Sequence, residues 1–360
     1  MSFYRILPMA LAVFIILTSI AFSLPRFTAM SEQKCNLCHV SPTGGGMRNS
    51  FGAQFFAFSE LASHETPFED IPKFQTQVSD IISLGADMRT IYLDDANADQ
   101  STFFQMEGNF YASAQLNKEF SLTLDKGLYS SFEVYGLAYV LPYAGYLRGG
   151  KFQPAYGWRY ADHTSFVREK MLWPAGSTDT GIEAGIYPHG VSLNLGLFNG
   201  TSDNFDNDKS KAIAVRFEYR HNLKGVGFGV GGSYWLNKHV DGDVKMFGPF
   251  GYLDLFNKKL IFLGEIDWLE NQVTATDKTA EAMTNKLNYL ITKGFWLTAS
   301  YDFYDPDIDL KSGKTSRYGL GIDYFPYGFL ELEPNLWIYQ DDLSPDNNYT
   351  KLNAQVHFFF

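Results

Sequence analysis

The last ten residues, Lys351-Leu352-Asn353-Ala354-Gln355-Val356-His357-Phe358-Phe359-Phe360, alternate apolar and polar side chains with little interruption. Successive side chains of an extended strand point to opposite faces. One face of this stretch is therefore wholly apolar, and it carries Leu352, Ala354, Val356, Phe358 and Phe360. The opposite face is mostly polar. This pattern predicts a β-strand that separates an apolar environment from a polar one.

The same alternation recurs from Ile81 onward in about sixteen segments, for example at 213–219, 295–303 and 330–338. Tight links between segments fall at 117–118, 142–145, 188–190, 222–225, 257–259, 293–294 and 326–328. Longer polar links fall between them at 200–210, 270–281, 305–315 and 340–348. Such alternation of short turns and long loops is typical of bacterial barrels, with short turns on the periplasmic side. We therefore predict an all-β fold, a transmembrane antiparallel β-barrel of about 16 strands. A soluble β-sandwich, the competing architecture, would show no alternation of links.

Composition favours the membrane barrel. Aromatic residues make up 17 % of the chain, with 32 Phe and 22 Tyr, and glycine contributes 32 residues. This mixture suits strands with lipid-facing apolar side chains and aromatic girdles at the two interfaces, so we expect outer-membrane lipid as a partner. The net charge of -11 argues against nucleic acid as a partner, because phosphate binding needs an excess of basic residues.

The first residues read as an export signal, with Arg5 before an apolar run from Ile6 to Phe22. The triplet Ala21-Phe22-Ser23 fits the small-x-small cleavage pattern. We expect a signal peptide over 1–23, a small segment over 24–75 and the barrel over 76–360. A retained membrane anchor is the alternative, although the run is short for a bilayer span.

Both cysteines of the protein lie in Cys35-Asn36-Leu37-Cys38-His39, a C-x-x-C-H pentapeptide. The two thiols can form thioethers with the vinyl groups of one haem c, and the adjacent imidazole of His39 can then ligate the iron. A redox dithiol or half of a zinc site is the alternative. There is no second cysteine pair to complete a zinc tetrahedron, and no βαβ pattern surrounds the motif. We therefore expect Cys35 and Cys38 to bind haem c and His39 to be the proximal ligand.

The residues after the pentapeptide contain a turn-rich run, Ser41 to Gly46, which could let the backbone pass close to the haem edge. A short helix is predicted over 49–62, with Phe51, Phe55, Phe58 and Ala62 on one face. That stripe would pack against the porphyrin or against the rest of the protein. Candidates for the second iron ligand are Met47, His64, Met30 and Met88, with Met47 or His64 preferred.

The longest link, from about Pro154 to Ser177, is either a solvated surface loop or an inward-folded constriction of the barrel. Asp162 and His163 within it form a weak candidate for a metal site. By the alternation, a set of charged residues should point into the lumen: Glu107, Glu133, Arg216, Glu218, Arg220, Glu265, Asp267, Asp302, Arg317, Asp323, Glu331 and Glu333. Their carboxylate excess would favour cations such as ferrous iron.

The chain as a whole resembles the fused monohaem cytochrome-porins of bacterial outer membranes. The resemblance rests on the export signal, the lead Leu24-Pro25-Arg26-Phe27-Thr28, the single C-x-x-C-H, the following Asn49-Ser50-Phe51-Gly52-x-x-Phe55 and the barrel pattern. The best-known members of that family are iron oxidases of iron-oxidising bacteria. The chain differs in its Gly44-Gly45-Gly46 run and its short barrel.

This resemblance implies an electron conduit in the outer membrane, with one covalent haem c at the periplasmic side or in the lumen. Extracellular Fe(II) or another redox partner would donate electrons, and periplasmic c-type cytochromes would accept them. An Fe(II):cytochrome c oxidoreductase activity would follow. Two alternatives remain, a diffusion porin with an accessory haem and a porin subunit of a multihaem complex that exports electrons.

Overall fold

The computed structural model describes residues 26–27, 29, 34–66, 75–128, 132–160, 162–203, 205–206, 208–239, 242–273, 278–344 and 348–360. These residues form sixteen strands of 8 to 16 residues. The strands are β1 (Ile82–Asp95), β2 (Gln100–Gln115), β3 (Phe120–Gly127), β4 (Phe132–Leu141), β5 (Gly145–Phe152), β6 (Asp179–Ile186), β7 (Val191–Phe198), β8 (Ala212–Leu223), β9 (Val226–His239), β10 (Gly242–Leu255), β11 (Leu260–Asn271), β12 (Lys278–Thr292), β13 (Phe295–Asp305), β14 (Thr315–Tyr327), β15 (Leu330–Asp341) and β16 (Asn348–Phe359).

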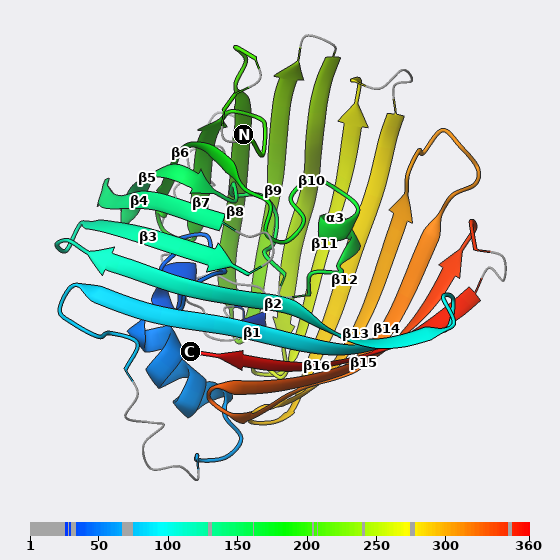
Figure 1. The fold of residues 1–360 in the computed structure, drawn as a ribbon, viewed down its shortest axis with the longest axis horizontal. Coiled ribbons are helices and arrows are strands. Elements are labelled where there is room, and N and C mark those ends of the chain that lie inside the picture. Colours follow the sequence, from blue (N-terminus) through cyan, green and yellow to red (C-terminus); the bar gives the residue numbers. More distant parts are fainter. Residues whose placement is uncertain are drawn as a thin grey trace, which may run out of the picture.

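Each strand pairs antiparallel with its neighbours in sequence, and β1 pairs with β16, so the sheet closes into a barrel (Figure 1). The closing register places Asp87 opposite Phe359 and Asp95 opposite Lys351. Closure removes the free sheet edges that an open sheet would expose. The predicted all-β barrel and its strand number are confirmed.

The outside of the barrel is apolar, and the inward-facing rows of its strands carry most of the polar side chains together with buried apolar clusters. In β16, Leu352, Val356 and Phe358 are 41 %, 37 % and 41 % exposed, whereas Asn353 and His357 are 7 % and 1 % exposed. The alternation in β3 is the same, with apolar side chains exposed and Ser121, Thr123 and Asp125 buried. A soluble sandwich has the opposite arrangement, because its apolar faces meet in a core. The predicted orientation of the two faces is therefore correct.

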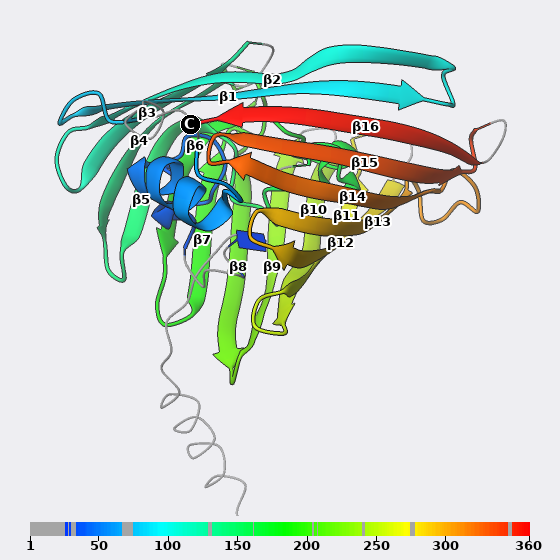
Figure 2. The ribbon, with the colours of Figure 1, turned by 90° about the horizontal axis from the view of Figure 1, so that it is seen from below.

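The seven tight links predicted from the sequence join β2–β3, β4–β5, β6–β7, β8–β9, β10–β11, β12–β13 and β14–β15. They lie at the same end of the barrel as the start of β1 and the end of β16, because the backbone amide of Gln115 bonds to Ile81 and that of Phe359 bonds to Phe329. Helix η3 (Phe51–Leu61) lies at this end too, beside the C-terminus in both views (Figures 1 and 2). We call this the short-turn end.

Before the barrel, the described residues of the N-terminal segment contain η2 (Cys35–Leu37) and η3. The predicted signal peptide, 1–23, lies outside the described residues, as does the candidate ligand Met30. Among the described residues, no helix is long and apolar enough to cross a membrane. The first strand begins at Ile82, inside the range that we predicted for the barrel.

The link between β5 and β6 folds into the barrel and carries the short helix α3 (Phe166–Glu169), which contacts β11, β12 and β13 (Figure 1). Phe166 and Val167 are almost fully buried there. Of the two interpretations of this link, the inward-folded one is confirmed, and the surface loop is excluded. We call residues 153–178 the inward loop.

Candidate functional site

The C-x-x-C-H pentapeptide forms a single tight turn followed by a small hairpin. The backbone amides of Cys38 and His39 both donate to the carbonyl oxygen of Cys35, at 3.1 and 2.9 Å. Val40 then donates to Met47 at 3.0 Å, and His39 pairs with Arg48 across the hairpin. The glycine run closes this hairpin, with φ angles of 82°, 71° and 59° at positions 44 to 46. Three consecutive left-handed residues explain why glycine occupies all three positions.

Asn49 connects the pentapeptide to η3. Its side-chain amide donates to the carbonyl oxygens of Asn36 and Leu37, at 3.0 and 2.9 Å. Its side-chain oxygen accepts a hydrogen bond from the backbone of Gly52 at 2.9 Å. The backbone amide of Asn49 also donates to the carbonyl oxygen of Cys38 at 3.0 Å. One asparagine therefore fixes the turn that carries both cysteines to the helix that follows it.

Helix η3 confirms the predicted helix, but only part of the predicted apolar face is buried. Phe51 and Phe55 are 36 % and 55 % exposed, and their rings contact each other. Phe56 and Leu61 are buried instead. The helix has π-type hydrogen bonding, seen in the bond from the amide of Ala62 to the carbonyl of Ala57 at 3.0 Å. Of the predicted stripe, Ala62 is buried and Phe58 packs partly buried against the core, so the prediction is correct for these two residues and wrong for Phe51 and Phe55.

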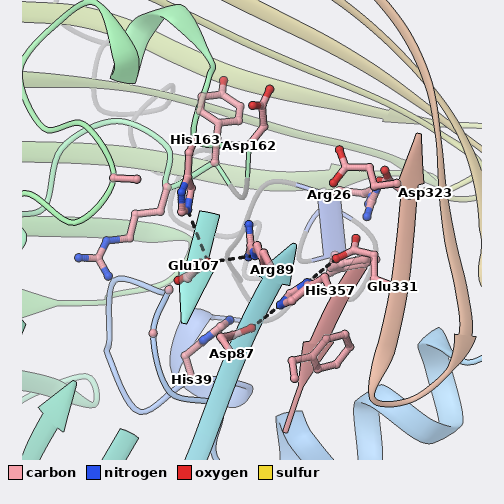
Figure 3. Close-up of a pocket in the computed structure, with 18 of the residues that line it drawn as sticks. Arg26, His39, Asp87, Arg89, Glu107, Asp162, His163, Asp323, Glu331 and His357 are labelled. Atoms are coloured by element: carbon pink, nitrogen blue, oxygen red, sulfur yellow. Dashed lines mark hydrogen bonds and ion pairs between the residues drawn. The ribbon is translucent and has the colours of Figure 1, made fainter. Parts of the chain in front are cut away.

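A cavity of about 410 Å³ lies inside the barrel, between the N-terminal segment, the inward loop and the wall of the barrel. Cys35, Cys38 and His39 all line it. Its apolar part includes Phe27, Phe56, Ala57, Leu61, Phe325 and Phe359. Figure 3 shows its polar part, in which side chains from β1, β2, β15 and β16 and from the inward loop face one another. The three predicted haem residues are thus brought together in one place.

The chemistry of this donor set fits a haem c. Cys35 and Cys38 are not joined by a disulfide, and burial raises the pKa of Cys38 to about 11, with a smaller contribution from Cys35. A redox dithiol needs a lowered thiol pKa, so this alternative is disfavoured. Burial, together with the charge of Arg48, lowers the pKa of His39 to about 4. The imidazole is therefore neutral at pH 7, as an iron ligand must be, and its buried Nδ1 has no hydrogen-bond partner among the described residues.

The described candidates for a second iron ligand lie away from this cavity. Met47 is buried in the hairpin beside Gly85, and Met88 is 45 % exposed on β1. His64 is exposed at the short-turn end, where its Nδ1 lies 2.8 Å from the Ser63 hydroxyl. The second ligand therefore stays a prediction.

Sequence reasoning missed Met106, whose side chain lines the cavity. Arg89 pairs with Glu107 and Thr90 pairs with Gln105, so Met106 is the extra residue of a β-bulge. A bulge interrupts the alternation of faces, and the pattern of period two cannot locate it. A short break in alternation at Gln105-Met106-Glu107 was the only available signal.

Ion pairs hold the inward loop against the wall of the barrel. Arg168 contacts Glu265 and lies 3.4 Å from Asp267. Arg317 contacts Asp302 at 2.7 Å, and the same carboxylate accepts the backbone amide of Phe166. The charged residues predicted for the lumen do face inward, and several of them bind this loop.

The weak metal candidate at Asp162 and His163 finds other partners. Asp162 pairs with Lys286 at 2.7 Å and lies 3.7 Å from Arg317. His163 lies 3.8 Å from Glu107. Because the single charge of Asp162 is already paired with Lys286, the Asp162–His163 pair is better explained as part of the attachment of the inward loop.

The comparisons with known proteins bear on the fold. No family model and no curated protein sequence matches the chain. Solved porin structures do match. OmpT, an outer membrane protein of Vibrio cholerae, has a TM-score of 0.58 at 12 % identity and covers 78 % of this chain and 100 % of its own. The anion-selective porin from Comamonas acidovorans has a TM-score of 0.56 at 12 % identity, covering 78 % and 99 %. OprB of Pseudomonas putida has a TM-score of 0.57 at 9 % identity, covering 78 % and 94 %. The chain therefore has the barrel fold of outer-membrane porins.

Proposed function

We propose that this protein is an outer-membrane electron conduit that holds one covalent haem c inside a porin-like barrel. The observation that carries the proposal is the position of Cys35, Cys38 and His39, which line one cavity within the closed sheet. The exposed apolar rows of the strands suit contact with lipid, and the export signal predicted from the sequence suits the outer membrane.

In this proposal each residue has a separate task. Cys35 and Cys38 would hold the porphyrin through thioethers, and His39 would ligate the iron. The bound haem supplies a one-electron couple. Asn49 keeps the cysteine turn in place, and the barrel excludes lipid while a small reductant enters the lumen. Extracellular Fe(II) gives up one electron and becomes Fe(III), and a periplasmic c-type cytochrome takes that electron.

Covalent haem attachment is the first test. The mature protein is expected to contain one haem c per chain, which a pyridine haemochrome spectrum measures. Cys38→Ala should lose covalent haem while it keeps a folded barrel that migrates anomalously on gels unless heated. Release of haem into acidified organic solvent from the denatured wild-type protein would contradict the proposal.

Electron transfer is tested separately, in proteoliposomes that contain the haem-loaded protein. Addition of Fe(II) outside should reduce the haem within seconds, and the reduction potential should be clearly positive. A strongly negative potential would favour the porin subunit of a multihaem export complex, which should then co-purify with multihaem partners.

A diffusion porin with an accessory haem is the second candidate, and the fold shared with known porins favours it. The two functions differ in conductance. A diffusion porin should pass ions freely in planar bilayers. The conduit should pass few, because both the inward loop and the N-terminal segment occupy the lumen.

A further inference from the structure

The cavity is also lined by a group of carboxylate side chains that lie far from the pentapeptide in sequence. Asp323 on β14 and Glu331 and Glu333 on β15 each offer a carboxylate oxygen, and these oxygens all lie within 4.8 Å of one another. All three residues line the cavity. Figure 3 shows Asp323 and Glu331 facing the same space, with Arg26 beside them. We call Asp323, Glu331 and Glu333 the carboxylate cluster.

The spacing of the cluster matches one metal ion. Oxygen ligands bind hard divalent cations at about 2.0 to 2.6 Å, so two oxygens on one ion lie at most about 4 to 5 Å apart. The observed span falls within that limit. Carboxylates are the preferred ligands of Mg²⁺, Mn²⁺ and similar ions, whereas soft ions prefer sulfur.

The charges around the cluster leave it short of positive charge. Arg26 contacts Asp323 and neutralises one carboxylate. Lys286 is held by Asp162 at 2.7 Å. His357 lies between Glu331 and Asp87 and contacts both. Glu333 accepts hydrogen bonds only from neutral amides, those of Asn335 at 3.0 Å and Gln355 at 2.8 Å. The three carboxylates therefore share one direct ion pair with an arginine, and a bound cation would add the positive charge that the amides do not supply.

An independent sign of a missing ligand is the second oxygen of Asp323. This residue is only 6 % exposed, and its Oδ1 atom is buried with no hydrogen-bond partner among the described residues. A buried carboxylate oxygen without a donor destabilises the folded state, because its lost hydration is not replaced. A cation bound by the cluster would remove that destabilisation.

We propose that Asp323, Glu331 and Glu333 form a binding site for one hard divalent cation inside the barrel, with Arg26 as a competing internal counter-ion. This site goes beyond the proposed function, since it does not require the haem. Its failure would leave covalent haem and electron transfer untouched, and loss of the haem would leave the cation site in place.

The test uses Mn²⁺ alone, titrated into the full-length protein in detergent and followed by electron paramagnetic resonance of free Mn²⁺. One saturable ion per chain is expected. Asp323→Asn and Glu333→Gln should each weaken binding by roughly tenfold or more, because each removes a ligand charge. Glu133→Gln is the matched control, since Glu133 lines the same cavity but pairs with Arg159. It should leave affinity nearly unchanged.

Arg26→Gln distinguishes a cation site from a cluster that only holds the N-terminal segment in place. Removal of the guanidinium should tighten Mn²⁺ binding several-fold, because like charges repel at short range. A structural role would predict a loosened N-terminal segment with no gain in affinity. The inference is overturned by the absence of saturable binding, by an equal loss in Glu133→Gln, or by weaker binding in Arg26→Gln. Heat-modifiable migration on gels confirms that each variant is folded.

Discussion

Gly52 lies against the backbone of Cys38 so closely that a Cβ atom at position 52 would stand 2.2 Å from the Cys38 carbonyl oxygen. This contact presses the first turn of η3 onto the cysteine turn. The same carbonyl accepts the backbone amide of Asn49 at 3.0 Å. The geometry of the pentapeptide therefore depends on a residue without a side chain, fourteen positions after Cys38.

Gly52→Ala should displace the cysteine turn, because backbone atoms cannot move aside cheaply. We expect a cost of about 1 to 3 kcal/mol in the stability of the N-terminal segment. Haem content per chain should fall well below that of the wild type, measured by pyridine haemochrome against total protein. Ser59→Ala on the exposed side of the same helix is the control. Full haem content in Gly52→Ala would show that the close contact is dispensable.

Asn49→Ala should loosen the same turn by a different route. It removes two donors to the carbonyls of Asn36 and Leu37 and the acceptor for Gly52. At about 0.5 to 1.5 kcal/mol for each of these three hydrogen bonds, the loss should be about 1.5 to 4.5 kcal/mol. Limited proteolysis should cut the variant faster within residues 34–66 and leave the barrel intact. Asn49→Asp keeps only the acceptor, so its cleavage rate should fall between those of wild type and Asn49→Ala.

Arg168→Ala should release the inward loop. Its guanidinium pairs with Glu265 and Asp267 and also donates to the carbonyl of Trp158 at 3.0 Å. Removal leaves two buried carboxylates without their cation, at a cost of about 3 to 5 kcal/mol. Single-channel conductance in planar bilayers should rise, since the loop no longer lies across the lumen.

Lys170→Ala is the matched control for Arg168→Ala. Lys170 pairs with Glu169 in the same loop, but the two side chains are 34 % and 40 % exposed. Exposed ion pairs contribute about 1 kcal/mol or less, so conductance and stability should stay close to wild type. Equal conductance in the two variants would mean that Arg168 does not hold the loop in place.

The barrel could be predicted from the sequence because lipid imposes its pattern on every strand. Leu352, Val356 and Phe358 face outward for the same reason that Asn353 faces the lumen, and no tertiary detail is needed to see it. The alternation of short and long links predicted how the strands are connected, because each strand of the barrel pairs with its neighbours in sequence.

The cavity could be predicted only in part. The chemistry of Cys35, Cys38 and His39 is local, so their grouping followed from spacing alone. Met106 turned inward through a bulge, and Phe56 replaced Phe55 on the buried face through π-type winding. Both residues depart from a regular period, so a prediction that assumes a regular period cannot locate them. The carboxylate cluster joins β14 and β15 to Arg26, about 300 positions earlier, and only the fold brings these residues together.

His163 should make the inward loop sensitive to acid. Burial and, to a smaller extent, the charge of Arg89 lower its pKa to about 4, against the opposing effects of Glu107, Asp162 and Asp87. An unfolded chain has the ordinary value of 6.5. Because the folded pKa is the lower one, the folded state prefers the neutral imidazole. Its stabilisation is complete above pH 6.5 and is lost progressively as the pH falls toward 4.

His163→Gln removes this titration and keeps a polar side chain of similar reach. Unfolding in urea, followed by tryptophan fluorescence at several pH values, should show a smaller loss of stability between pH 6.5 and 4 in the variant than in the wild type. The difference should vanish above pH 7, where both side chains are neutral. His64→Gln is the control, since His64 is exposed and lies outside the cavity. Parallel curves for His163→Gln and the wild type across this range would assign the acid sensitivity to other groups.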